Sequence, residues 1–111
     1  MAFDLQNWEA QLRKGQLELI LLALLRGRER YGYELIAEAQ TYLDRPLLEG
    51  TVYPVLNRMA RDELVEHHWV VEDGVKPRKY FRLTSEGERT LGDMRERWQR
   101  QQTNLRNLLE G

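Results

Sequence analysis

Residues 48–62 read LEGTVYPVLNRMARD, and the rest of the chain is organised around this stretch. Its apolar residues recur at i, i+3, i+4 and i+7, a spacing that predicts an amphipathic helix with one buried stripe: Val52, Val55, Leu56 and Met59. The residues off this stripe carry hydroxyl, amide and guanidinium groups, which suit phosphates and the edges of bases. The pattern therefore predicts a recognition helix, beginning close to Gly50. Pro54 lies in or just beyond its first turn, where at most one backbone hydrogen bond is lost.

A second predicted helix stands directly before this stretch. It opens at Tyr31-Gly32-Tyr33, turns Leu35, Ile36 and Ala39 inward, and ends at Asp44-Arg45-Pro46 because the residue before a proline is disfavoured in a helix. Two helices joined by a short turn, the second with a polar outer face, are typical of a helix-turn-helix.

Two short strands are predicted directly after the recognition helix. Residues 64–71 (LVEHHWVV) are rich in β-branched and aromatic residues, Glu72-Asp73-Gly74 is a hairpin turn, and residues 78–83 (RKYFRL) form the return strand. This hairpin is expected to form a wing. Residues 75–82 (VKPRKYFR) contain four basic residues and no acid, so the wing is expected to be locally basic.

Near the N-terminus, residues 3–12 predict a short amphipathic helix with Asp4 as its N-cap. Lys14-Gly15 is interpreted as a break. Residues 16–26 are apolar nearly all round, which predicts a core helix that Gly27 ends.

The last predicted helix begins near Thr84-Ser85, since Ser85 and Glu88 have capping-box spacing. Its residues Leu91, Met94, Trp98, Gln101, Leu105 and Leu108 alternate at three- and four-residue spacing. Inside the chain only the first helix could cover this stripe. The economical interpretation is a pairing helix and hence a dimer.

Composition narrows the class of protein further. The chain has 111 residues, 41% hydrophobic residues and no cysteine, which predicts one domain without disulfides or thiolate chemistry. Its net charge is −1, so a nucleic-acid site must depend on local charge. Neither a signal peptide nor a membrane span is recognisable, and the longest apolar run covers only residues 19–25, so a cytoplasmic protein is expected.

The sequence gives little indication of a catalytic or metal-binding site. Ser85 is expected to serve a helix cap, and no base stands ready to activate it, so we expect no enzyme and no cofactor. His67 and His68 are adjacent on a predicted strand and point to opposite faces, so they cannot share one metal ion.

Four segments in order resemble the PadR family of transcriptional regulators, in its short form with a single C-terminal helix. They are GQLELILLALL (15–25), YGYEL (31–35), EGTVYPVLNRM (49–59) and RKYFRLTSEG (78–87). The resemblance implies a dimeric winged helix-turn-helix that represses transcription and releases DNA when a small molecule binds. It further implies that the N-terminal helix packs with the partner's C-terminal helix, and that a flat aromatic effector stacks on a tryptophan at the position of Trp98. Here Arg95, Arg97 and Arg100 make that stretch strongly charged.

The expected fold is mainly α-helical with a small β-hairpin. We expect an N-terminal helix at the dimer interface (1–14), a winged helix-turn-helix DNA-binding domain (15–84) and a C-terminal dimerisation helix (85–111). The expected function is a sequence-specific DNA-binding regulator, a ligand-responsive homodimeric repressor on a palindromic operator. Two alternatives remain, a winged-helix protein-interaction module without DNA binding and a small-molecule binding protein that has lost DNA function.

Three groups of site residues follow. DNA is expected to be bound by Thr51, Tyr53, Asn57, Arg58, Arg61, Lys76, Arg78 and Lys79, with Asn57 and Arg58 reaching bases. An aromatic effector is expected at Trp8, Met94, Trp98 and Gln101. Interface core is an equally good interpretation for Trp98 and the preferred one for Trp8. Dimerisation is expected through Leu5, Trp8, Leu12, Leu91, Met94, Trp98, Leu105 and Leu108.

Overall fold

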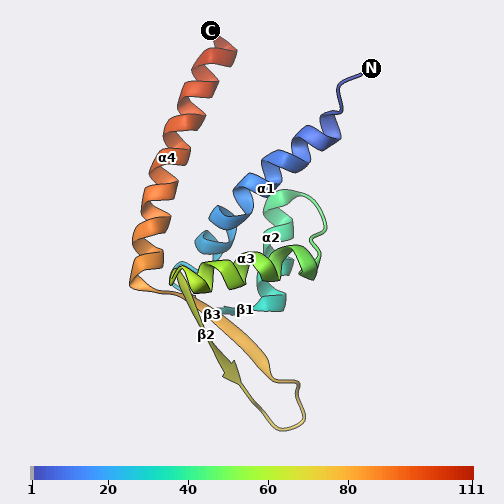
Figure 1. Cartoon of the computed structure of the whole chain (residues 1–111), viewed down its shortest axis with the longest axis vertical. Coiled ribbons are helices and arrows are strands. Elements are labelled where there is room, and N and C mark those ends of the chain that lie inside the picture. Colours follow the sequence, from blue (N-terminus) through green and yellow to red (C-terminus); the bar gives the residue numbers. More distant parts are fainter. Residues whose placement is uncertain (1) are drawn as a thin grey trace.

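The computed structural model describes residues 2–111, which form helices and a small antiparallel sheet (Figure 1). The first helix, α1, spans Leu5–Leu24, and the Asp4 side chain caps it by accepting a hydrogen bond from the Asn7 backbone N–H at 3.1 Å. The predicted break at Lys14-Gly15 is wrong, because α1 runs through both residues. A single glycine inside a helix lowers the stability of the helix by only about 1 kcal/mol relative to alanine. The helical preference of the residues on both sides outweighs this loss. The sequence predicts a helix that runs to Arg26, but α1 ends at Leu24, and Gly27 lies in the following turn with a left-handed φ of 74°.

The helix-turn-helix is confirmed by α2 (Gly32–Leu43) and α3 (Glu49–Arg61). Asp44 ends α2 in the left-handed conformation, with φ of 55°. The Gln40 side chain accepts a hydrogen bond from the Leu47 backbone N–H at 2.8 Å, which fixes the turn between the helices. Pro54 lies inside α3 and is tolerated near its start.

The predicted hairpin is confirmed, and it is joined by a strand that the sequence pattern did not predict. β2 (Val65–Val70) pairs antiparallel with β3 (Arg78–Leu83), in a register that sets His67 opposite Phe81. The short strand β1 (Arg30–Tyr31) adds to the other edge of β3, which gives the order β1-β3-β2. The wing is therefore anchored to the segment that precedes α2.

One apolar core joins these elements. Its buried residues come from all four helices and from the inner ends of β2 and β3: Leu17, Leu21, Leu22, Leu25, Leu35, Ile36, Ala39, Leu43, Val52, Leu56, Met59, Val65, Phe81 and Leu91. All four predicted stripe residues of α3 either belong to this core or pack against it. The recognition helix is thus held by its apolar stripe, and its other face is free.

The last helix, α4, spans Ser85–Glu110. Its N-cap is Thr84, so the predicted capping box at Ser85 and Glu88 is wrong by one residue. The Thr84 hydroxyl accepts from the Gly87 backbone N–H at 2.9 Å and donates to the Glu63 carbonyl oxygen at 2.5 Å. Because it bonds both α4 and the turn after α3, Thr84 fits the cap position better than Ser85. Gly87 is required as glycine, since a Cβ there would overlap the Leu64 carbonyl oxygen.

The N-terminal part of α1 and the C-terminal part of α4 extend away from this core, and they diverge towards the chain ends (Figure 1). The radius of gyration is 16.3 Å, against about 13 Å for a compact chain of this length. Within residues 2–111, no helix is both long and apolar enough to span a bilayer.

Candidate nucleic-acid interface

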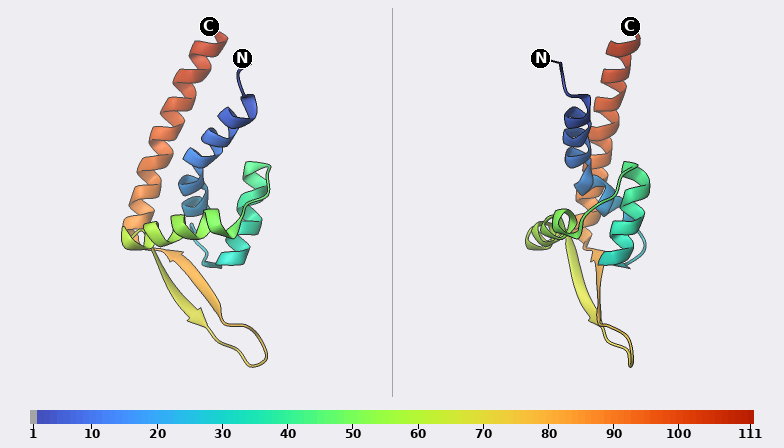
Figure 2. Two further views of the ribbon diagram at one scale, coloured as in Figure 1. Left: turned by 45° about the vertical axis from the view of Figure 1, so that its right-hand side comes forward. Right: turned by 90° about the vertical axis from the view of Figure 1, so that its right-hand side faces the viewer.

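α3 stands out on one side of the molecule, and the β2–β3 hairpin extends from its C-terminal end, away from α1 and the far end of α4 (Figures 1 and 2). The inner face of α3 is fixed in the core by Val52, Leu56 and Met59, which are at most 1% exposed. The opposite face consequently projects into solvent together with the wing. A convex helix beside a hairpin has the shape that enters a DNA groove.

The middle of this projecting face is polar and free. Asn57 and Arg61 are exposed there, as the sequence predicts, and Thr51 is exposed on the flank towards α1, where it borders a cleft with Ala10 and Arg13. Within residues 2–111, Asn57 and Arg61 take part in no ion pair or side-chain hydrogen bond. An unengaged amide and guanidinium can meet a base edge or a phosphate without first breaking a contact.

Arg58 is placed differently. It lies on the flank of α3 that faces α1, and its Nη2 atom donates to the Glu18 Oε1 atom at 2.7 Å. The partner stands 40 residues away in the sequence, and no spacing or motif signals this contact. Of the two residues predicted to reach bases, Asn57 is free and Arg58 is engaged by an acid.

Tyr53 lies on the other flank and fastens α3 to α2. A Cβ on Gly32 would overlap the Tyr53 hydroxyl oxygen and lie 2.9 Å from its Cζ atom, so the ring rests directly on the glycine backbone. This close approach explains the glycine in the YGYEL segment. Burial, followed by the nearby Glu49 carboxylate, raises the pKa of the Tyr53 hydroxyl above its ordinary value.

The basic residues of the wing do not all face the same way. Arg78 and Lys79 are neighbours on β3 and therefore point to opposite faces of the sheet. The Arg78 guanidinium lies 4.7 Å from the centre of the Tyr31 ring, and the Lys79 ammonium lies 5.4 Å from the centre of the Phe81 ring. Lys76 is exposed in the loop between the strands. A groove that received the hairpin would meet a cation on each face and one in the loop.

Aromatic side chains stiffen one face of the wing. His68 stacks on Tyr80 with ring centres 5.8 Å apart, and Tyr80 meets Tyr31 edge-on at 5.5 Å. His67 lies instead near Phe81, at 6.0 Å. The two histidines thus have separate surroundings, as the strand geometry predicts, and no group of metal-ligating side chains occurs within residues 2–111.

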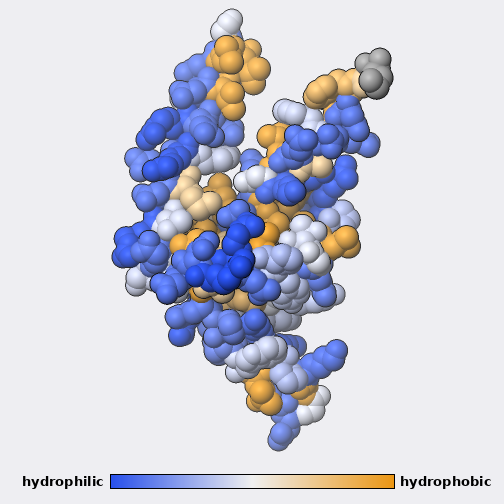
Figure 3. Space-filling view, viewed as in Figure 1, coloured by the Kyte–Doolittle hydropathy of each residue, from blue (hydrophilic) through white to orange (hydrophobic). Residues whose placement is uncertain are grey.

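The wing also carries apolar surface that the basic pattern did not indicate. Trp69, Val71 and Val75 are 59%, 74% and 44% exposed. Hydrophobic atoms are visible at the lower end of the space-filling view, where the hairpin lies (Figure 3). Beside the cations, the wing can therefore make van der Waals contacts to a partner.

The residues predicted for dimerisation separate into two groups. Leu91 is buried in the core of its own protomer, and Met94 packs against that core. The other six are exposed on the projecting arms: Leu5, Trp8 and Leu12 on α1, and Trp98, Leu105 and Leu108 on α4. Figure 3 shows hydrophobic atoms near the free end of α4 and along the α1 arm. The arms thus leave a large part of their apolar stripes uncovered.

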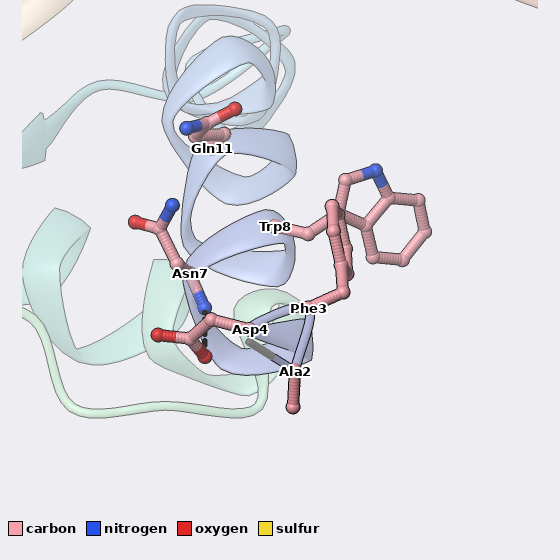
Figure 4. Close-up of a pocket in the computed structure, with 6 residues that line it drawn as sticks. All are labelled: Ala2, Phe3, Asp4, Asn7, Trp8 and Gln11. Atoms are coloured by element: carbon pink, nitrogen blue, oxygen red, sulfur yellow. Dashed lines mark hydrogen bonds between the residues drawn. The ribbon is translucent and has the colours of Figure 1, made fainter.

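The four predicted effector residues do not share one cleft in the protomer. Trp8 lines an open cleft of about 500 Å³ with Ala2, Phe3, Asp4, Asn7 and Gln11, all from the N-terminal segment and α1. In Figure 4 the Phe3 and Trp8 rings lie side by side and point away from Asn7. Met94, Trp98 and Gln101 belong to α4 and do not line this cleft.

Comparison with known proteins agrees with this arrangement. A family model described as the transcriptional regulator PadR-like family matches residues 21–93. An uncharacterized protein of Lysinibacillus sphaericus is 35% identical over 88 residues, which cover 77% of this chain and 80% of that protein.

Solved structures of similar shape come from the same group of regulators. A PadR-like transcriptional regulator from Bacillus cereus is 33% identical, with a TM-score of 0.82, and the match covers 91% of this chain and 98% of that one. Bacillus subtilis PadR in complex with operator DNA is 22% identical, with a TM-score of 0.63, over 70% of this chain and 45% of that one. At that identity the likeness shows the fold alone.

Proposed function

Because this chain belongs to the PadR-like family of transcriptional regulators, we propose that it is a ligand-responsive repressor that binds a palindromic operator as a homodimer. Members of the family are transcriptional regulators and not enzymes. The observation that carries the proposal is the free polar face of α3, with Asn57 and Arg61 exposed beside a hairpin that carries cations on both faces.

DNA contacts divide by the position of each side chain. Asn57 projects from the free face of α3 and is assigned to base edges in the major groove, together with Arg58 once it leaves Glu18. The remaining DNA-binding residues are assigned to phosphates: Thr51, Tyr53, Arg61, Lys76, Arg78 and Lys79. Bacillus subtilis PadR, which has the same fold, was seen in complex with operator DNA, and this supports DNA binding by a protein of this fold.

The dimer is proposed from the uncovered apolar arms. Leu5, Trp8 and Leu12 follow helical spacing on α1, and on α4 the exposed residues Trp98, Leu105 and Leu108 continue the stripe that begins in the core at Leu91. If these two stripes pack against a second copy, each Å² of apolar area removed from water stabilises the dimer by about 25 cal/mol. A two-fold dimer presents two α3 helices, so the operator is expected to be an inverted repeat.

A response to a small aromatic molecule is proposed at the same interface. Trp98 is 40% exposed on the α4 stripe, and Trp8 is 48% exposed on the α1 arm. A second copy that packed on these arms would bring further side chains around both rings, with Met94 and Gln101 on the same side of α4. A flat ligand could then stack on Trp98.

A protein-interaction module remains the rival function, and the apolar wing surface at Trp69, Val71 and Val75 is the observation that favours it. A retardation assay separates the two. The purified protein should retard fragments enriched from a DNA pool, with affinity that falls steeply as salt rises. Arg58→Ala should weaken retardation while the elution volume of the dimer stays unchanged. If no fragment is retained even at low salt, the DNA-binding proposal fails.

A further inference from the structure

The contact between Arg58 and Glu18 is the single ion pair that joins α1 to α3 within residues 2–111. The Arg58 Nη2 atom lies 2.7 Å from the Glu18 Oε1 atom, and the two side chains are 47% and 46% exposed. The pair is therefore open to solvent, on the α1-facing flank of the helix that is proposed to bind DNA.

The backbone position of Glu18 is fixed by buried neighbours on α1. Glu18 lies on α1 between Leu17, which is 4% exposed, and Leu21, which is fully buried. These core residues fix the rotation of α1 about its axis, which places the Cα–Cβ bond of Glu18 on the side towards α3. Arg58 is anchored in the same way by its neighbour Met59, which is 1% exposed.

A phosphate or guanine contact would require the same guanidinium that Glu18 now holds. On binding DNA, Arg58 can either break its ion pair with the Glu18 carboxylate or retain it. In the first case, the stabilisation by the ion pair is lost. In the second case, the Glu18 negative charge remains within a few ångströms of the phosphate backbone and repels it. Both routes lower the affinity for DNA.

From this geometry, and resting on the proposed DNA-binding function, we propose that Glu18 limits operator affinity by holding Arg58 in the DNA-free protein. Glu18 is a positioning residue that acts through Arg58 and makes no DNA contact itself. Because α1 also carries the exposed stripe assigned to the dimer interface, the position of α1 and the availability of Arg58 are linked through one contact.

The opposite effect is physically possible, since an acid can orient an arginine for its target. The two cases differ in the sign of one measurement. Glu18→Gln removes the charge and keeps the shape of the side chain. If Glu18 withholds Arg58, this substitution tightens DNA binding; if Glu18 orients Arg58, it weakens binding.

The test measures retardation of one enriched fragment by the wild type, Glu18→Gln, Arg58→Gln and the double variant, with thermal unfolding confirming that each is folded. An exposed ion pair is worth about 0.2–1 kcal/mol, so Glu18→Gln should bind about 1.5- to 5-fold more tightly for each protomer. The slope of log affinity against log salt should also become steeper, by up to about 0.9 for each released arginine. In the Arg58→Gln background the gain should largely vanish.

Glu9→Gln is the matched control, because Glu9 is also on α1, is 55% exposed and lies 3.8 Å from Arg13. It should change affinity much less than Glu18→Gln. Unchanged or weaker binding by Glu18→Gln overturns the proposal, as does an equal gain in the Arg58→Gln background, which would indicate a general charge effect. If the wild type retains no DNA, the proposed function itself fails, and this outcome is distinct from both.

Discussion

Replacing Gly32 by alanine should destabilise the joint between the two helices of the helix-turn-helix. Gly32 is the first residue of α2 and is buried beneath the Tyr53 ring of α3. A Cβ there would overlap the Tyr53 hydroxyl oxygen and lie only 2.9 Å from Cζ, so the ring must move. Tyr53 packs against the core, so the ring gives up part of this packing when it moves.

The size of the effect follows from two opposing contributions. Overpacking of this kind costs about 1–3 kcal/mol. Alanine regains up to about 1 kcal/mol of helix propensity, and less at the first position of a helix. The net loss of unfolding free energy should be about 1–2 kcal/mol, which lowers the melting temperature by about 5–10 °C.

Thermal unfolding at one fixed protein concentration measures this change. Gly15→Ala is the matched control, since Gly15 is also helical but has nothing within 4 Å of its Cβ position, and it should stabilise the protein by about 0.5–1 kcal/mol. Tyr53→Phe removes the overlapped oxygen and should recover part of the loss in Gly32→Ala. If Gly32→Ala melts like the wild type, or if Tyr53→Phe recovers nothing, the proposed packing of Tyr53 on Gly32 is refuted.

Three further outcomes are expected. Glu63 follows α3 with φ of 62°, and its N–H and that of Leu64 bond back to Ala60 and Met59, so Glu63→Gly should raise the unfolding free energy by about 1 kcal/mol; a lower melting temperature would contradict this. Because the pKa of Tyr53 is raised in the folded state, its neutral hydroxyl stabilises the fold below pH 10, and this stabilisation is lost as the pH rises beyond that. The unfolding free energy should therefore fall less steeply with pH in Tyr53→Phe than in the wild type. Parallel curves of unfolding free energy against pH for the two proteins would count against this prediction. Saturable quenching of tryptophan fluorescence by aromatic ligands should disappear in Trp98→Ala, and quenching that survives would place the ligand elsewhere.

Local patterns in the sequence were sufficient to predict most of the fold. The apolar stripe from Val52 to Met59, the turn at Asp44-Arg45-Pro46 and the hairpin around Gly74 each depend on residues close in the chain, and all three are confirmed. Gly15 was misread because the break signal of one glycine is weaker than the helical preference of the residues on both sides.

Contacts between distant residues could not be predicted. β1 consists of two residues, and it exists because Arg30 and Tyr31 pair with Phe81 and Tyr80 about 50 residues later. The pairing of Arg58 with Glu18 is of the same kind. The polar face of α3 was therefore predicted as a set of residues, but their division into free and engaged side chains required the three-dimensional structure.

Selection of fragments from a random DNA pool with the purified protein shows whether two copies of α3 bind DNA together. We predict that the enriched fragments share an inverted repeat, with half-sites centred about one helical turn (10–10.5 base pairs) or a multiple of it apart. Asn57→Ala should weaken the preference for this repeat more than it weakens binding to unrelated DNA. A pool that shows no enrichment, or a single unrepeated site bound by a monomer, would rule out paired recognition by two α3 helices.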